Sequence, residues 1–435
     1  MGPLPRTIGL LHHIGGGNLG DDATQAAVML NIRRRWPHVT LIGFSINPDD
    51  TRNRHGIPAY AIRRRPWTLG AQIGRTELTA TDNIKSVLSK NRLLFGLLKA
   101  IYSVVVKAPR ELCAELLFLA RAFRVLRSVD LLIINGGGQL TEWGGPWGFP
   151  YTLFKWTLLA RLAKVRCIFL NVGAGPLTRP LSKFFAKRAL SSSNYASFRD
   201  EASSTLVRRI GFEGRSPVFP DSAYGLALPA LGGSGGTRAP GKPIVGLAPM
   251  PYCDPRAFHE KDQRVYAGFI RKLALFASWV VRNDYRVALF GSDIGTDPLA
   301  IEDLHSALRT DPEVAQRSHS VIDEPVLSVE QLLESMSSMD YVVTCRFHGV
   351  LFAHLLNKPV VAIAHHPKVA TLMSDMGLAQ YCLDIRSFDP DLLIATFTAL
   401  VRHGEEVRER MAERLACYRR ESTKQFDDLF PQVAR

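Results

Sequence analysis

The sequence predicts an α/β fold in which two doubly wound, Rossmann-like domains face a central cleft. Apolar runs of strand length alternate with helix-length segments along most of the chain, as in parallel sheets covered by helices on both faces. The alternation stops at residues 229–243, which hold five glycines and three prolines, and then resumes. We therefore expect a flexible linker there, and the 435 residues suffice for a domain on each side of it.

The first domain is expected over residues 1–228. Short apolar runs bounded by turn residues predict its strands, which cover residues 7–14, 39–46, 129–138, 165–175 and 195–200. The intervening segments predict helices within residues 15–36 and over 151–164, 180–192 and 201–211. The alternation is lost over residues 48–128, and a divergent helical insertion is expected at about 60–128.

The second domain is expected over residues 244–388 and repeats the same alternation. Its predicted strands cover residues 244–250, 285–293, 340–349 and 358–364. Its predicted helices cover residues 266–283, 298–309, 329–339 and 350–356. The charged residues 389–435 are expected to form C-terminal helices.

Composition narrows the class of protein. The chain is 46% hydrophobic and 22% charged, which excludes a disordered or fibrous protein. Its six cysteines show no CxxC pair and no histidine at metal-binding spacing, so we expect reduced thiols, a cytoplasmic location and no metal. The N-terminal apolar run is broken by His12 and His13 and is too short for a secretory signal.

The net charge of +14 points to an anionic partner. No nucleic-acid recognition motif accompanies the charge, so we expect either a phosphorylated small molecule or an anionic membrane surface. Residues 93–122 are densely apolar but carry six charged side chains, too many for a membrane span. This segment either forms a pair of buried helices or lies peripherally on the inner face of the plasma membrane.

Ligands of parallel sheets bind beyond the carboxyl ends of the strands, and the first candidate loop there is GGGNLGDDA. Gly16, Gly17 and Asn18 would let backbone amides approach an anion at the start of a helix. Asp21 and Asp22 either cap that helix or supply a general base for a substrate hydroxyl.

Two further loops of the first domain carry candidate residues. In NGGGQLTEW, Gly137 and Gly138 either form a tight turn or allow close approach of a ligand, and Glu142 and Trp143 could bind a sugar by hydrogen bonding and stacking. In SFRDEAS, Arg199 either forms a structural ion pair with Asp200 or clamps an anion.

The strongest candidate loop is TCRFHGVLF in the second domain. Arg346 can hold a phosphate or carboxylate in two parallel hydrogen bonds, and His348 can exchange a proton near neutral pH. Lys368 follows the next strand and adds a second cation to the same rim.

Taken together, these stretches resemble the polysaccharide pyruvyltransferase family. The resemblance runs from about Gly9 to Leu378, with residues 60–125 diverging. It rests on an ordered set of motifs: GGGNLGDDA, NGGG, SFRDEAS, VFPDSAYGL, CRFHGVLFAHLLNKPVVAI and HPKVATLMSDMGL. It implies a GT-B-like fold and a transferase that moves pyruvate from phosphoenolpyruvate to two hydroxyls of one sugar, forming a cyclic ketal.

The resemblance also implies roles for particular residues. Arg346, Phe347 and His348 of the second domain would contact phosphoenolpyruvate, together with Arg199 of the first domain, and the first domain would otherwise bind the acceptor. We expect His348 to be the general acid, Asp21 or Asp22 the base, and Asp221 either a base or the group that orients His348. Phosphoenolpyruvate is then a donor substrate, and no cofactor is needed.

Other functions and the identity of the acceptor stay open. The alternatives are a GT-B glycosyltransferase that uses a nucleotide sugar and a non-enzymatic polysaccharide-assembly protein. The sequence leaves open which sugar is the acceptor, whether it is free, lipid-linked or polymeric, and how many copies of the chain associate.

Overall fold

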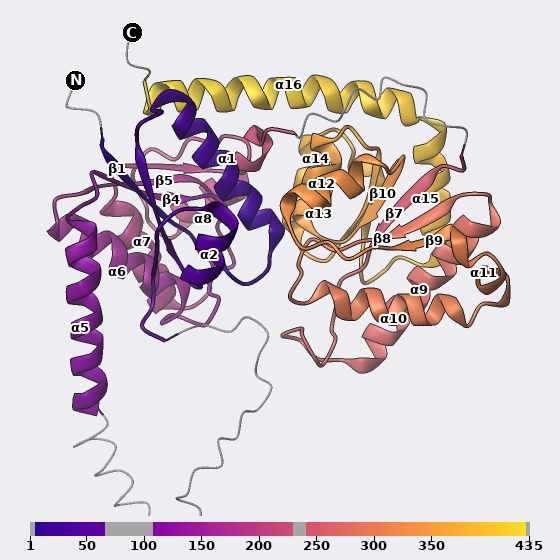
Figure 1. Cartoon of the computed structure of the whole chain (residues 1–435), viewed down its shortest axis with the longest axis horizontal. Helices are drawn as coiled ribbons and strands as arrows, with labels where there is room; N and C mark the ends of the chain where they lie inside the picture. The colour runs from indigo at the N-terminus through magenta and orange to yellow at the C-terminus, as the bar shows by residue number, and fades with distance from the viewer. Residues whose placement is uncertain (1–4, 66–107, 229–240, 432–435) are drawn as a thin grey trace, which may run out of the picture.

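The computed structural model describes residues 5–65, 108–228 and 241–431. These residues form two parallel six-stranded sheets that lie side by side, each flanked by helices (Figure 1). This is the expected α/β architecture of two doubly wound halves. The predicted insertion falls largely on residues 66–107 and the predicted linker largely on residues 229–240, both outside the described residues.

The first half contains one sheet and its surrounding helices. Its strands are β1 (Thr7–Leu11), β2 (Thr40–Ser45), β3 (Ala59–Ala61), β4 (Leu131–Asn135), β5 (Arg166–Val172) and β6 (Tyr195–Phe198). Its helices are α1 (Leu19–Arg35), α2 (Pro48–His55), α5 (Ala108–Leu126), α6 (Phe149–Leu162), α7 (Pro180–Ser191), α8 (Glu201–Arg209) and the 3-10 helix η2 (Ser222–Gly225). The strands pair in the order β3-β2-β1-β4-β5-β6.

The second half repeats this plan. Its strands are β7 (Ile244–Ala248), β8 (Arg286–Leu289), β9 (Val321–Asp323), β10 (Tyr341–Thr344), β11 (Val360–Ala364) and β12 (Cys382–Asp384), in the order β12-β11-β10-β7-β8-β9. Its longer helices are α9 (Gln263–Arg282), α10 (Asp297–Arg309), α12 (Val329–Ser337), α13 (Phe347–Leu355), α14 (Pro367–Asp375), α15 (Pro390–Arg402) and α16 (Gly404–Leu429). Shorter helices are α11 (Pro312–Gln316), η3 (Ser318–Ser320) and η4 (Ala379–Tyr381).

The first sheet has a different helical layer on each face. Alternate strand residues such as Leu132 and Phe169 pack against α5, α6 and α7, whereas their neighbours Ile133 and Ile168 pack against α1. This alternation follows from the two-residue repeat of side chains along a strand. The layer of α5, α6 and α7 therefore presents its other side outward.

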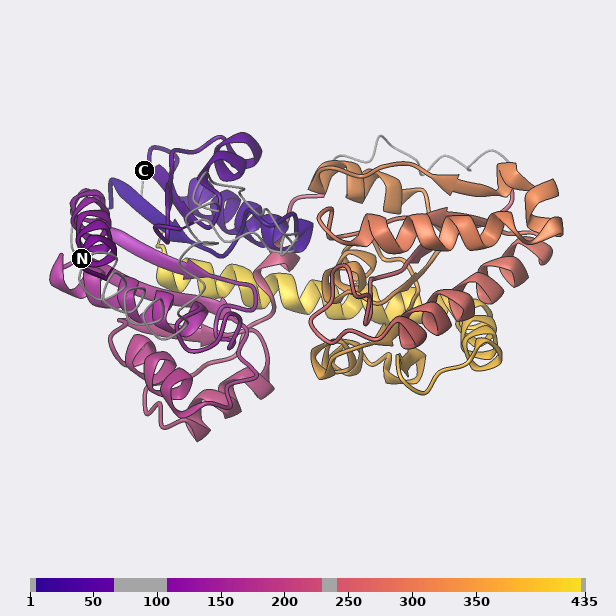
Figure 2. The same cartoon turned by 90° about the horizontal axis from the view of Figure 1, so that it is seen from below.

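Helix α16 connects the two halves. It starts beside the second sheet and runs back across the first half (Figures 1 and 2). Near its end Phe426, together with Phe430 beyond it, is buried in the core beside α1, and the Asp427 carboxylate accepts hydrogen bonds from the Arg35 guanidinium at 2.7 and 2.9 Å. The charged C-terminal segment thus completes the core of the first half.

Several boundaries differ from the predicted ones. Strand β1 ends at Leu11, so His12 and His13 belong to the loop that follows it. Helix α13 begins at Phe347 rather than at residue 350, which places His348 in its first turn. Strands β3, β9 and β12 and helix α2 were not predicted; each of these strands has three residues, too few to show a repeat.

Within the described part of the chain, no helix is long and apolar enough to cross a membrane. Residues 108–122 of the apolar segment at 93–122 form most of α5, and residues 93–107 lie outside the description. All six cysteines are free thiols.

Candidate active site

A cavity of about 440 Å³ lies between the two halves. The loops that follow β1 and β4 line it on one side, and the loops that follow β7 and β10 line it on the other. In each sheet these two strands are adjacent although they are far apart in the chain, which marks the switch point where doubly wound sheets bind ligands. The predicted residues that line the cavity are Gly16, Asn18, Asp21, Gly138, Trp143, Arg199, Arg346, Phe347, His348 and Lys368.

The two halves touch directly at the edge of this cavity. The Leu19 amide donates to the Ser292 carbonyl and the Ile294 amide donates to the Gly17 carbonyl, both at 2.9 Å. Gly17 has a φ of +88°, and a Cβ there would lie 2.9 Å from the Ile294 side chain. A glycine at this position therefore serves the contact between the halves, and Gly17 does not line the cavity.

Arg346 is held rigidly at the cavity wall. Its Nε and Nη2 donate to Asp297 Oδ1 at 3.0 and 2.5 Å, and its Nη2 also donates to Thr296 Oγ1 at 3.0 Å. Burial alone would lower the pKa of Arg346, but Asp297 and Asp293 raise it. Asp297 is fully buried and also accepts the backbone amides of Ser292 and Asp293, so one carboxylate fixes both the arginine and the loop that contacts the first half.

Two more cations enter the cavity beside Arg346. The Arg199 guanidinium lies 4.4 Å from the centre of the Phe347 ring and donates from Nη1 to Asp221 at 3.2 Å. Its buried Nε makes no hydrogen bond but lies 3.6 Å from Asp200 Oδ2, in the ion pair predicted as one alternative. Burial lowers the pKa of Lys368 to about 8, with Arg199 contributing. Positive charge from both halves thus converges on one space.

His348 is buried, and its imidazole is uncharged near neutral pH. Burial, helped by Arg199 and Lys368 and opposed by Asp221, lowers its pKa to about 3. Its Nε2 has no hydrogen-bond partner. The ring packs against the backbone of Gly20, where a Cβ would lie 1.9 Å from the ring, so α1 and α13 can approach closely only with a glycine at this position.

The pKa of Asp21 is shifted upward, whereas that of His348 is shifted downward. Burial, reinforced by Asp22 and opposed by Arg199 and Lys368, raises its pKa to about 7. Its carboxylate lies near His12, since a Cβ built on Gly137 would be 3.0 Å from Asp21 Oδ1 and 2.9 Å from His12 Nε2. A carboxylic acid that keeps its proton near neutral pH can donate it, which contrasts with the expected base role of Asp21 and acid role of His348.

Several residues that line the cavity were not predicted. The His13 ring stacks on the Phe149 ring with a centroid distance of 3.4 Å, and the Trp143 ring lies 5.2 Å from the Phe149 ring. His13 Nδ1 is hydrogen-bonded to Gln139, and its buried Nε2 has no partner. Across the cavity lie Phe258 and His259, with ring centroids 4.6 Å apart. Aromatic surfaces therefore line the cavity from both halves.

His12 is a second unpredicted histidine at the site. It is buried, and neither ring nitrogen has a hydrogen-bond partner. Burial and the nearby His13, His55 and His348 keep its pKa well below the usual value. Unpaired buried nitrogens are costly unless a ligand or water satisfies them.

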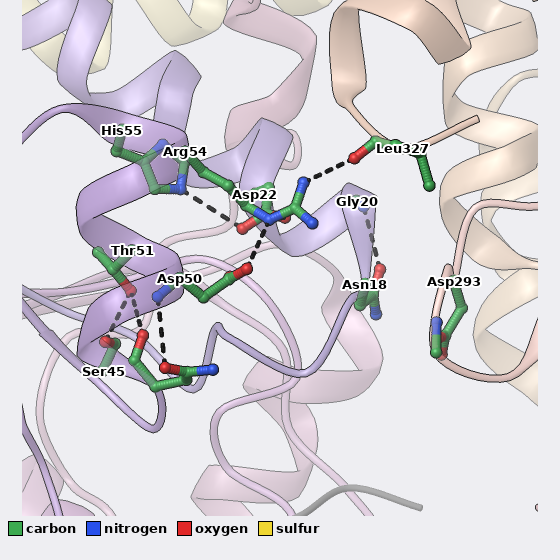
Figure 3. A network of polar contacts seen from close by, with 12 residues as sticks. Asn18, Gly20, Asp22, Ser45, Asp50, Thr51, Arg54, His55, Asp293 and Leu327 are labelled. Carbon is green, nitrogen blue, oxygen red and sulfur yellow. Dashed lines mark hydrogen bonds and ion pairs between the residues drawn. The ribbon is translucent and has the colours of Figure 1, made fainter. Parts of the chain in front are cut away.

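Asp22 does not line the cavity, contrary to expectation. It faces α2, where its carboxylate lies 3.4 Å from His55 Nε2 and 3.6 Å from Arg54 Nε (Figure 3). Arg54 in turn donates to the Leu327 carbonyl of the second half at 2.9 Å. Asp22 therefore supports the contact between the halves through Arg54.

Three other predicted residues, Glu142, Gly137 and Asp221, contact neighbouring groups of the protein itself. Glu142 accepts hydrogen bonds from the backbone amides of Thr178 and Arg179 at 2.6 and 2.5 Å, just before α7, and it does not line the cavity. Gly137 lies against the side chains of His12 and Asp21. Asp221 binds Arg199 and the Ala223 amide and borders an adjoining cavity of about 220 Å³.

No group of three or more His, Cys, Asp or Glu side chains suited to a metal ion occurs among residues 5–65, 108–228 and 241–431. The ten predicted lining residues supply cations, one raised-pKa carboxylic acid and an uncharged histidine. Such a set can bind a small polyanion and move protons.

Comparison with known proteins relates the chain to a family. A family model described as polysaccharide pyruvyl transferase matches residues 18–367. No curated protein sequence matches the chain significantly. Among solved structures, HepE from Anabaena in complex with UDP has a TM-score of 0.53 at 11% identity over 98% of both chains. The UDP-GlcNAc 2-epimerase from Neisseria meningitidis has a TM-score of 0.56 at 12% identity over 97% of this chain and 98% of that one. At these identities the likeness shows the fold, which is GT-B-like.

Proposed function

Because the chain belongs to the polysaccharide pyruvyl transferase family, and is therefore a transferase, we propose that its donor is phosphoenolpyruvate. The product would be a cyclic ketal that bridges two hydroxyls of one sugar in a polysaccharide or a lipid-linked oligosaccharide. The observation that carries this proposal is the convergence of Arg199, Arg346 and Lys368 on one cavity. Phosphoenolpyruvate carries a phosphate and a carboxylate, which require at least two cationic contacts.

The proton affinities support a division of roles between Asp21 and His348. Protonated Asp21 gives its proton to the methylene carbon of the donor, and the oxygen of one sugar hydroxyl bonds to the adjacent carbon C2. Neutral His348 accepts the proton of that hydroxyl. The roles are thus the reverse of those expected from the sequence, because burial raises the pKa of Asp21 to about 7, so that it holds a proton to donate, whereas the lowered pKa of His348 leaves its imidazole without one.

The second half of the reaction releases phosphate. The bond between C2 and the phosphate oxygen breaks, its electron pair leaves with the phosphate, and the second hydroxyl attacks C2 to close the ketal. One hydroxyl proton replaces the proton that Asp21 gave up, and the other leaves with phosphate. Arg199 and Lys368 stabilise the charge of the departing group.

The acceptor is proposed to bind on the first-half side of the cavity. Trp143 and Phe149 offer apolar ring faces to a sugar, and the free Nε2 of His13 can bind a hydroxyl. The six free cysteines fit the reducing cytoplasm as the place of this reaction.

The test is incubation with phosphoenolpyruvate and a panel of free and lipid-linked oligosaccharides, with mass measurement of the products. One added pyruvyl ketal and one released phosphate per acceptor are expected. A thermal-shift panel separates the alternatives: stabilisation by phosphoenolpyruvate supports the proposal. Stabilisation by a nucleoside diphosphate alone would contradict it and favour a nucleotide-sugar glycosyltransferase.

A further inference from the structure

The outer side of the α5, α6 and α7 layer is unusually apolar. Single exposed apolar residues are normal on proteins, but a cluster of them indicates an interaction surface. The exposed large apolar side chains here are Leu112, Leu116 and Leu117 on α5, Leu158 and Leu162 on α6, and Leu181 and Phe184 on α7. We call these seven residues the apolar layer.

The same three helices carry a large excess of positive charge. Their basic residues are Arg110, Arg121, Arg124, Lys155, Arg161, Lys183, Lys187 and Arg188. Their acidic residues are Glu111 and Glu115, and both are paired, Glu111 with Arg64 and Arg65 and Glu115 with Lys155. Eight positive and two negative charges leave a net charge of +6 on these helices.

We propose that the outer face of α5, α6 and α7 binds the surface of a bilayer that contains anionic phospholipids. Leucine and phenylalanine side chains enter the boundary between headgroups and acyl chains, while arginine and lysine contact the phosphates. A protein partner with an acidic, apolar surface would need matching shape as well, whereas a bilayer needs only this composition. The surface includes α6 and α7 and so extends well beyond the segment at residues 93–122.

The proposed surface lies close to the cavity through the start of α6. Trp147 packs against Tyr151 of α6 and Phe185 of α7, with centroid distances of 5.1 and 5.5 Å. Two residues later Phe149 lines the cavity. A sugar attached to a lipid in the bound bilayer would therefore reach the acceptor side of the cavity; this extension, unlike the vesicle binding itself, rests on the proposed function.

The test is co-sedimentation with vesicles of phosphatidylcholine alone or mixed with phosphatidylglycerol, at low and high salt. The full chain should sediment with the mixed vesicles at low salt and much less with the neutral ones. The double variant Leu116→Glu/Leu162→Glu should lower the bound fraction by about tenfold, since it removes two apolar contacts and adds two negative charges.

A matched control uses Leu275→Glu/Leu327→Glu. Leu275 and Leu327 lie in the second half and are 53% and 62% exposed, against 55% for Leu116 and 63% for Leu162. Equal vesicle binding by the control and the wild-type chain supports the proposal, provided that both variants melt like the wild type. Equal losses in the two variants, or no binding by the wild type at low salt, would overturn it.

Sedimentation velocity tests whether a second copy of the chain binds this surface instead of a bilayer. If the wild-type chain dimerises and Leu116→Glu/Leu162→Glu makes it monomeric, the surface binds a second copy and the proposal fails. Neither measurement involves phosphoenolpyruvate or a sugar, so its outcome is independent of the proposed reaction.

Discussion

The two halves share one strand order but carry different chemistry at the ends of their strands. In each half the first strand lies beside the fourth, and the second and third strands extend to one side. Both halves contribute a cation and aromatic rings, but the first half adds glycines and the acidic Asp21, whereas the second adds His348 and two cations, Arg346 and Lys368. The scaffold therefore fixes where a ligand binds, and the loops decide what each side recognises.

The largest effect is expected where the two sides meet, at Asp21. Asp21→Asn keeps the shape but removes the proton, so kcat should fall by about 10³-fold, within the usual range for a general acid. The dissociation constant for phosphoenolpyruvate should change little. In the wild-type enzyme, activity should fall as the pH rises above about 7, because Asp21 then loses its proton.

Thermal melting provides a check that needs no substrate. The pKa of Asp21 is raised from 3.8 to about 7 in the folded chain, so the folded state holds this proton more tightly than the unfolded state. The ligand-free wild type should therefore lose stability between about pH 4 and pH 7. Asp21→Asn should melt higher than the wild type at about pH 8 and equally near pH 4; a constant difference would contradict the raised pKa.

The donor side is tested by Arg346→Lys. Lysine keeps the charge but cannot bond to Asp297 through two nitrogens while presenting a planar fork to a ligand. Affinity for phosphoenolpyruvate should weaken by roughly 1 to 3 kcal/mol, measured by calorimetry. The KM for the acceptor should stay within twofold. An unchanged donor affinity would assign the clamp to Arg199 and Lys368 alone.

The acceptor side is tested by Trp143→Ala. Losing one stacked ring should raise the KM for the acceptor by about fivefold, from a contact of about 1 kcal/mol. Phosphoenolpyruvate affinity should be unaffected, which is the converse of the Arg346→Lys result. If Trp143→Ala weakened donor binding instead, the division between the halves would be wrong.

The smallest effect on activity is expected at Glu142, the residue before Trp143. Its carboxylate bonds to backbone amides before α7 and not to the cavity, so Glu142→Gln should change kcat and both KM values by less than about twofold. Stability should fall by about 1 kcal/mol, as for loss of a charged hydrogen bond. A large rise in the acceptor KM would restore the sugar-binding role first expected for it.

The long elements could be predicted because their side-chain repeat is visible in the sequence. Strand β10 lies within its predicted range of residues 340–349 but ends at Thr344, and α7 begins where predicted and ends one residue earlier. The edge strands β9 and β12 could not be found, because three residues show no repeat. The packing of Phe426 against the first sheet was also hidden, since no local pattern relates the end of the chain to α1.

At the site, the sequence allowed residues in glycine-rich loops and charged residues that follow strands to be predicted as lining the cavity. Their protonation states could not be predicted. The pKa values of Asp21 and His348 depend mainly on burial, which depends on tertiary contacts that no local pattern shows. Asp297 gave no signal, because it begins an ordinary amphipathic helix and acquires its role through contact with Arg346. The surroundings of Asp22 could not be predicted, because its partners, Arg54 and His55, lie on the unpredicted helix α2.

Helix α16 has a consequence for how the protein is made. The first half emerges from the ribosome first, but the core on the α1 side of its sheet includes Phe426 and Phe430. Until these residues are synthesised, apolar side chains of α1 such as Ile32 lack part of their cover. The first half therefore cannot complete its core until translation has passed both sheets.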